Sequence, residues 1–428
     1  MGGESEMSSI PKGYKKTDVG EIPDDWAVKK LGEIADIISG GTPKTTEKSF
    51  WNGAILWCTP TDITRTSGRY IESTEKTITD NGLKNSSAIL LPINSLLLCS
   101  RATVGDVRIA KHEITTNQGF KSLVCNSSAY YLFIYYLIPF LKPKMLEKSY
   151  GSTFLEISKS NLASIQIQLP SYVEQQAIAE VLSDMDALIE AQKELIAKKR
   201  DIKQGTMQEL LSGRVRLPGY ETKGWKHTDI GDIPDDWVVR ELGDICEKII
   251  GGGTPSRNNK IYWNGKIPWA TVKDLSSFNF NSTQEYITEE GLRESSSTLI
   301  PAGTIILATR MLIGKPVIYN CSVAINQDLK ALFLIKDYDK YYLLYYLNMK
   351  SNELIAASSG STVLGLSIQD LKTINLISPS LLSEQQAIAR VLSDMDDELE
   401  TLEAELEKLN HMKRGMMQEL LTGRIRLI

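Results

Sequence analysis

The clearest pattern in the sequence is a pair of long segments in which apolar residues recur every three or four positions. These segments cover residues 171–212 and 380–422, contain no proline, and each begin at a Pro-Ser step. This period predicts two long amphipathic helices with a coiled-coil seam. The seam is expected at Leu182, Met185, Ile189, Leu392, Met395, Leu399, Leu402, Leu406 and Leu409.

Local signals mark where these helices begin and end. Ser171 followed by Glu174 predicts a capping box, and Gly213 and Gly423 predict left-handed ends. Each helix would be about 60 Å long at a rise of 1.5 Å per residue. The simplest way to bury two such apolar stripes is to pack the helices against each other.

Glycines interrupt both helical patterns at Gly205 and Gly415. A glycine inside a helix costs about 1 kcal/mol relative to alanine. Because the cost is repeated, we expect the backbones to approach closely at a helix crossing.

The whole chain is one unit repeated with a period near 210 residues. Residues 12–34 return as 223–245, GGTP at 40–43 returns at 252–255, and WNG at 51–53 returns at 263–265. Arg101, Asn117, Gln118 and Lys121 match Arg310, Asn326, Gln327 and Lys330. The final GRIRLI at 423–428 matches GRVRLP at 213–218, which leads into the second unit. The order is therefore cyclic and predicts a pseudo-two-fold axis with antiparallel helices.

Short apolar runs separated by glycine and proline turns predict an α+β domain, present twice. In the first copy, strands are expected at 88–91, 95–100, 106–110, 120–125 and 165–169, with helices at 129–141 and 158–163. The expected division is a disordered tail at 1–11, domains at 12–170 and 223–379, helices at 171–212 and 380–422, a linker at 213–222 and a tail at 423–428.

The formal net charge of −5 does not argue against a nucleic-acid partner, because the negative charge is concentrated on the helices. The helical segments 384–414 and 174–203 carry −5 and −2, which leaves the rest of the chain slightly positive. The domains are therefore free to present basic faces to a nucleic acid.

Cysteine and histidine usage argues against a metal site or a disulfide framework. The five cysteines have no CxxC spacing, and the three histidines are at unrelated positions, which suits a reducing cytosol. No signal sequence or apolar run of 18 residues is present, so we expect a cytoplasmic protein without a membrane span.

No catalytic motif emerges from the sequence. There is no GxxxxGK[ST] string, and the GGTP loops are not followed by a convincing dinucleotide-binding unit. The adjacent acids of the repeated IPDDW, at 22–26 and 233–237, allow metal-dependent hydrolysis as an interpretation. A turn anchored by Trp26 and Trp237 is the favoured interpretation.

Several of these strings together resemble the specificity subunit of a type I restriction-modification system. They are EQQAIA followed by a leucine pair and Gly-Arg, the IPDDW entrance, the GGTP loop and NQGFK, and the resemblance runs from Lys12 to Ile428. It implies two target-recognition domains, each reading one half of a split, asymmetric double-stranded DNA target. The helices would set the spacer and dock two adenine methyltransferase subunits, which restriction subunits join.

The resemblance also implies a subunit that is not an enzyme and binds no cofactor itself. S-adenosylmethionine would be held by the methyltransferase partner, and ATP and Mg²⁺ by the restriction partner. One alternative is the recognition subunit of a related system whose methylase and nuclease share a single partner chain. Another is a scaffold that joins protein partners through its helices.

Base-reading residues are expected where the two copies diverge. On this criterion, with the arginines and lysines near strand ends, the candidate DNA contacts are Lys44, Thr45, Thr46, Lys48, Thr61, Arg65, Arg69, Arg101 and Lys121 in the first copy, and Arg257, Asn258, Asn259, Lys260, Lys273, Arg310 and Lys330 in the second. The alternatives are solvated loops and, for Arg101 and Arg310, internal salt bridges. The Gly-Ser-Thr triplets at 151–153 and 360–362 are candidate phosphate binders or structural turns.

The candidate partner-binding residues are Gln175, Gln176, Gln385 and Gln386, near the helix starts. A solvated helix face is the alternative interpretation. No metal ligand is predicted.

Overall fold

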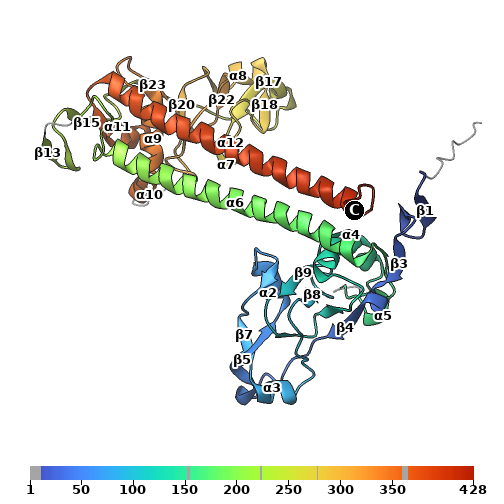
Figure 1. Ribbon diagram of the computed structural model, residues 1–428. Helices are drawn as coiled ribbons and strands as arrows, with labels where there is room; N and C mark the ends of the chain where they lie inside the picture. The colour runs from blue at the N-terminus through green and yellow to red at the C-terminus, as the bar shows by residue number, and fades with distance from the viewer. Residues whose placement is uncertain (1–10, 152–154, 222–223, 277, 359–364) are drawn as a thin grey trace, which may run out of the picture. The chain divides into compact units, whose positions relative to one another are not determined.

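A computed structural model describes residues 11–151, 155–221, 224–276, 278–358 and 365–428 (Figure 1). The packing divides the chain into a first unit, residues 1–193 with 405–428, and a second unit, residues 194–404. The expected tail at 1–11, apart from Pro11, lies outside the described residues, as do Ser152, Thr153, Gly360, Ser361 and Thr362 of the two triplets.

The first unit contains one α+β domain. Its elements are β1 (Tyr14–Thr17), β2 (Gly20–Pro23), β3 (Ala27–Lys30), α1 (Leu31–Ile34), β4 (Ala35–Ser39), η1 (Lys48–Phe50), β5 (Trp51–Cys58), α2 (Pro60–Arg65), β6 (Tyr70–Ile71), β7 (Lys76–Ile78), α3 (Asp80–Lys84), β8 (Leu96–Leu98), β9 (Val107–Ala110), β10 (Ile114–Thr116), β11 (Lys121–Cys125), α4 (Tyr131–Glu147), α5 (Lys159–Ala163) and β12 (Gln166–Leu169). The sheets have the orders β4-β11-β8-β9-β6, β10-β5-β7, β1-β2 and β12-β3.

The second unit contains the matching domain. Its elements are β13 (Trp225–Thr228), β14 (Gly231–Pro234), β15 (Trp237–Glu241), β16 (Cys246–Gly251), η2 (Lys260–Tyr262), β17 (Trp263–Ala270), α7 (Val272–Ser276), β18 (Glu285–Ile287), α8 (Glu289–Arg293), β19 (Thr298–Ile300), β20 (Ile305–Ala308), β21 (Pro316–Ile318), β22 (Val323–Ile325), β23 (Leu329–Leu334), α9 (Lys340–Met349), α10 (Ser351–Ser358), α11 (Ile368–Lys372) and β24 (Asn375–Pro379). The sheets have the orders β16-β23-β20-β21, β18-β17-β22-β19, β13-β14 and β15-β24.

Burial on both faces explains why the central strands are apolar throughout. Side chains alternate across a strand, so Leu96 and Leu98 of β8 pack with α4 in one core, while Leu97 packs in another with Cys58 and Ile114. In the second unit β20 is divided in the same way between two cores. The two larger sheets have five and three strands in the first domain and four strands each in the second. Each domain also packs a helix, α4 or α9, in its core, and the α+β prediction is confirmed.

Two local predictions for the first domain were wrong. The expected strand at 88–91 is reduced to one bridge between Leu91 and Ile114. The helix expected to end at Leu141 continues to Glu147 despite Pro139 and Pro143, because Met145 is still buried in the core.

The two predicted long helices are α6 (Tyr172–Leu211) and α12 (Leu382–Leu420), and each is divided between the two units. Their N-terminal halves belong to domain cores: Leu182 packs in the first unit and Leu392 in the second. Gly213 and Gly423 end them with φ of 73° and 75°, as predicted.

Contacts within each unit show that α6 and α12 pair in antiparallel fashion. In the first unit Asp186 pairs with Lys413 at 2.5 Å, and the Gln192 amide donates to Glu405 at 3.3 Å. In the second unit, an ion pair of 2.6 Å joins Arg200 to Glu403, and Lys203 pairs with Asp396. Residue numbers rise along α6 as they fall along α12 (Figure 1).

A polar triad links this helix pair to each domain. The Tyr136 hydroxyl donates to Asp186 at 2.7 Å, and Asp186 also binds Lys413. In the second unit Tyr345 donates to Asp396 at 2.7 Å, and Asp396 pairs with Lys203. In the first half of each long helix, an aspartate thus binds a tyrosine of a domain helix and a lysine of the other long helix.

The entrance motif of the first domain is closed by a buried ion pair. Glu174, with 1% of its side chain exposed, accepts from the Trp26 indole at 3.0 Å and from the Arg426 guanidinium at 2.8 Å. Arg426 also donates twice to Asp25, at 2.9 and 2.8 Å, and these bonds lower the pKa of Asp25. The structural interpretation of the repeated IPDDW is confirmed for Trp26, which is buried.

This arrangement corrects the predicted capping box. The Ser171 hydroxyl does accept from the Glu174 backbone N–H at 3.2 Å. The Glu174 side chain, however, binds Trp26 and Arg426, because a carboxylate buried this deeply needs a charged partner.

The second unit repeats the closure with residues from the middle of the chain. Arg216 binds Glu384 at 2.7 and 2.8 Å and Asp236 at 2.9 and 2.8 Å. Its guanidinium carbon lies 5.4 Å from the ring centre of the buried Trp237. Burial raises the pKa of Glu384, and the bonds from Arg216 oppose that shift.

The C-terminal tail therefore packs against the entrance motif of the first unit, as residues 213–217 pack against that of the second. The Tyr14 hydroxyl donates to the Gly423 carbonyl at 2.8 Å. A Cβ on Gly423 would lie 2.7 Å from Pro23, and one on Gly213 would lie 2.7 Å from Pro234. These paired contacts support the cyclic order predicted from the repeat.

The expected close approach at the helical glycines is wrong. Gly205 and Gly415 lie on exposed faces, and a Cβ built on either meets nothing within 4 Å. Packing within this chain therefore does not require glycine at these positions.

We predict that Arg426→Ala lowers the free energy of unfolding by about 3 kcal/mol, because it leaves Glu174 buried without its cation. Urea unfolding followed by tryptophan fluorescence measures the loss. Arg424→Ala is the matched control, since Arg424 is 60% exposed and pairs with Glu419 at 3.6 Å. That change should cost less than about 0.5 kcal/mol; equal losses for the two variants would contradict the role given to Arg426.

We also predict that Gly205→Ala and Gly415→Ala each raise the free energy of unfolding by about 1 kcal/mol, the difference in helix propensity. Chemical denaturation of the isolated chain measures the change. A decrease would show that the backbone at these positions needs glycine.

Candidate nucleic-acid interface

Two tryptophans hold the glycine-rich loop of the second unit. The Trp269 indole donates to the Gly253 carbonyl at 3.2 Å, and the Trp263 indole donates to the Ser256 carbonyl at 3.1 Å. The two rings meet edge to face with centroids 5.2 Å apart. Residues 257–260, which follow the loop, are therefore presented from a rigid support.

The first unit repeats this support. Trp57 donates to the Gly41 carbonyl at 2.9 Å and Trp51 to the Lys44 carbonyl at 3.2 Å, with ring centroids 5.0 Å apart. The repeated glycines fit because the loop backbone lies against a neighbouring strand end. A Cβ on Gly40 would collide with the backbone of Asn117.

The repeated Asn-Gln turn brings separate predicted segments together. The Thr42 hydroxyl donates to Gln118 at 2.5 Å, and Thr254 donates to Gln327 at 2.7 Å. Beside this turn, Arg310 pairs with Asp328 at 3.7 Å. The glycine-rich loop and the arginine loop thus lie on one face of the domain.

Most of the predicted DNA contacts are exposed, either on these loops or on the short helices η1, α2, η2 and α7. The exposed residues are Lys44, Thr45, Thr46, Lys48, Thr61 and Arg65 in the first unit, and Arg257, Asn258, Lys260, Lys273 and Arg310 in the second. Arg65 pairs with Glu75 at 2.6 Å, and both side chains are more than half exposed.

Three predicted contacts are only partly accessible. Arg101 and Asn259 are half-buried, and the Asn259 side chain caps η2 by accepting from the Ile261 N–H at 3.2 Å. Lys330 is half-buried and donates to the Gln327 carbonyl, and burial lowers its pKa.

Two predicted contacts have internal roles and are corrected. Arg69 donates to Tyr136 at 2.9 Å and to the Ser183 hydroxyl at 2.8 Å, so it reinforces the triad at the helix pair. Lys121 is buried and lies 3.4 Å from Glu156.

Two predicted partner contacts are corrected for the same reason. Gln175 is fully buried and holds the Tyr130 N–H at 2.7 Å and the Pro170 carbonyl at 3.0 Å. Gln385 is buried and holds Asp339 and Pro379 in the same way. Gln176 and Gln386, one position later on each helix, are exposed.

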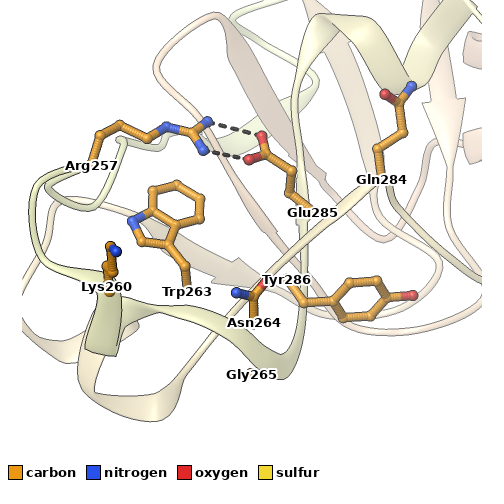
Figure 2. A pocket seen from close by; sticks show the side chains of 8 residues that line it. All are labelled: Arg257, Lys260, Trp263, Asn264, Gly265, Gln284, Glu285 and Tyr286. Atoms are coloured by element: carbon orange, nitrogen blue, oxygen red, sulfur yellow. Dashed lines mark hydrogen bonds and ion pairs between the residues drawn. The ribbon is translucent and has the colours of Figure 1, made fainter.

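An open pocket of about 640 Å³ lies beside the loop of the second unit (Figure 2). The Arg257 guanidinium stacks on Trp263, 3.8 Å from the ring centre, and its forked end binds Glu285, with one bond of 2.8 Å. These bonds raise the pKa of Arg257 and lower that of Glu285, so the pair stays charged at neutral pH. Tyr286 from β18 and Gln284, the residue just before that strand, also line the pocket.

Sequence reasoning missed Gln284, Glu285 and Tyr286, although they are the divergent positions of a repeated string, STEKTIT at 73–79 and STQEYIT at 282–288. The strand register locates their counterparts. Glu285 pairs with Trp269, and Lys76 of β7 pairs with the equivalent Trp57. The same position on the same frame therefore carries opposite charge in the two units.

Among the described residues, no group of three or more His, Cys, Asp or Glu side chains is placed to hold a metal ion. Within the same part of the chain, no helix combines the length and apolar character needed to cross a membrane.

A family model described as "Type I restriction modification DNA specificity domain" matches residues 23–198 and again 234–411. The chain belongs to this specificity family. Each matched segment begins at the proline of an IPDDW motif and ends within a long helix. The resemblance drawn from the repeated motifs is confirmed.

Relatives in the specificity family match most or part of the chain. The MjaIX specificity subunit of Methanocaldococcus jannaschii is 33% identical over 379 residues, which cover 86% of each chain. The EcoR124I/EcoR124II specificity subunit of Escherichia coli is 32% identical over 164 residues, covering 37% of this chain and 40% of that subunit.

Solved structures of this family share the fold. The S subunit from M. genitalium aligns with a TM-score of 0.56 at 16% identity, over 92% of this chain and 96% of that one. A chain from a study of complex assembly and conformational transition in the type I system aligns with a TM-score of 0.60 at 18% identity, over 94% and 99%.

Proposed function

We propose that each domain of this type I specificity subunit reads one half of a split, asymmetric DNA target. The helices set the spacer and dock two adenine-N6 methyltransferase subunits, which restriction subunits join. The chain itself directs the chemistry and does not perform it.

The observation that carries this proposal is a variable surface on a constant frame. Both units keep the tryptophan pair, the glycine-rich loop and the Trp-Asn-Gly strand start, yet the residues mounted there differ. The second unit has Arg257 and Glu285, while Lys76 takes the place of Glu285 in the first. Two readers that share a scaffold but differ in side chains would recognise two different half-sites.

The exposed side chains suit both parts of DNA recognition. Lys44, Lys48 and Lys260 can neutralise phosphates, which gives affinity without sequence information. Gln284 and Asn258 can bond adenine edges, and Glu285 can accept from the cytosine amino group.

The long helices suit the spacer role. Half-sites read from one side of DNA lie about 34 Å apart or at multiples of that distance. A continuous helix shared by both units would hold the half-site spacing more firmly than a flexible linker.

The exposed faces of the helices support methyltransferase docking. Gln176 and Gln386 occupy equivalent exposed positions, and Gly205 and Gly415 leave equivalent open surfaces. Two copies of one partner need such a repeated surface. A related system with a fused methylase-nuclease partner is the alternative, and a pull-down that yields one partner chain would favour it.

We predict that the chain, co-expressed with its cognate adenine methyltransferase, produces N6-methyladenine in a split asymmetric motif with a fixed gap. Long-read sequencing maps the motif. The double variant Arg257→Thr with Glu285→Lys, which gives the second cluster the residues of the first, should change one half of the motif and leave the other half and the gap intact.

The wild-type complex separates DNA reading from a scaffold role. Absence of any motif while the methyltransferase is bound and folded would contradict DNA reading. A salt-dependent DNA shift with the wild-type complex excludes the scaffold alternative.

A further inference from the structure

A methionine stands at the tip of the turn between β20 and β21. Met311 is 81% exposed, the highest fraction among the large hydrophobic residues that the structure describes. Its φ is 61°, in the left-handed region, which is unfavourable for a residue other than glycine. An apolar side chain held out in water by a strained backbone does not serve the core of the domain.

The turn itself belongs to the repeat, while the side chain at its tip does not. In the first unit Ala102 has φ 63° at the corresponding place between β8 and β9. The Gly105 N–H bonds the Cys99 carbonyl at 3.1 Å, and the Gly314 N–H bonds the Ala308 carbonyl at 3.1 Å. The two units therefore build one turn and differ in what they present from it.

Contacts place this tip beside the candidate interface. Arg310, the residue before Met311, pairs with Asp328 at 3.7 Å. The amide of Gln327 donates to Asp328 at 3.3 Å, and Gln327 in turn receives the Thr254 hydroxyl of the glycine-rich loop at 2.7 Å. Met311 thus follows an arginine that is linked through Asp328 and Gln327 to the glycine-rich loop, and that loop leads into Arg257.

We propose that Met311 is a specificity residue that makes an apolar contact with the bases of the second half-site. This rests on the proposed reading of DNA by the second unit. Arg310 would engage phosphate or a base edge and steer the tip into a groove, and the flexible thioether would fill the space against the bases. Apolar side chains read DNA by touching a thymine methyl group in the major groove or by wedging into a base step in the minor groove.

The test compares Met311→Ala with the wild-type chain in the complex with its methyltransferase. Alanine is the residue that the equivalent turn already carries, so the backbone should keep its form. Dissociation constants are measured for the duplex identified by methylation mapping and for all its single base-pair substitutions. We expect about tenfold weaker binding to the target, with discrimination lost at one or two adjacent positions of the second half-site only.

Two controls define the contact. Met311→Leu keeps an apolar side chain and should retain affinity within about threefold. Leu299→Ala, which truncates another exposed apolar residue of the same unit, should leave affinity unchanged.

Base analogues separate the two grooves. Replacing thymine by uracil in the second half-site should weaken the wild-type complex and leave Met311→Ala unaffected if the contact is with a methyl group. If the contact is a wedge, 2-aminopurine at the affected step should brighten on wild-type binding and stay dim with Met311→Ala.

The inference fails if the wild-type complex is sequence-specific and Met311→Ala matches it in affinity and in discrimination at every position. It also fails if the loss is spread evenly over both half-sites. Absence of sequence-specific binding by the wild-type complex would instead overturn the proposed function.

Discussion

The fold depends on a carboxylate that is buried where each long helix begins. Glu174 and Glu384 each have 1% of their side chain exposed, and an ionised carboxylate at that depth is stable only beside a cation. The required arginines, Arg426 and Arg216, come from the segments that follow the other long helix. This requirement brings three parts of the chain together at one point: the start of a long helix, the tryptophan of the entrance motif and the segment that follows the other long helix. Because both units have the same arrangement, the C-terminal tail is a structural part of the first domain.

The constant frame of each unit allows its surface to vary. The paired tryptophans and the Asn-Gln turn make the hydrogen bonds that hold the glycine-rich loop in place. The exposed side chains of the loop therefore need not contribute to stability. Arg257 with Glu285 in one unit and Lys76 in the other are compatible with the same backbone. Met311 and Ala102 show the same independence at a second turn. Under the proposed function, a scaffold of this kind would let the target sequence change while assembly through the helices is preserved.

The sequence predicts the large elements well because their signals are strong and local. The period of the apolar residues, the terminal glycines and the 210-residue repeat were enough for the two helices, the α+β class and the cyclic order. Contacts between residues that are distant in the sequence could not be predicted from it. Glu174 has the spacing of a capping box, and only the fold shows that its charge is needed by Arg426. Gln175 and Arg69 look like surface residues, but the packing buries them wholly or partly. Gln284, Glu285 and Tyr286 were missed because strand register, which no local pattern encodes, places them beside Arg257.

We propose that two independent readers on one repeated frame give the target its asymmetry. The most direct measurement is the methylation motif of a chain in which residues 26–170 are replaced by residues 237–379, so that both positions carry the second reader. We predict a palindromic split motif, with the second half-site present twice in inverted orientation and with the original gap. A motif that stays asymmetric, or that keeps the original first half-site, would contradict it.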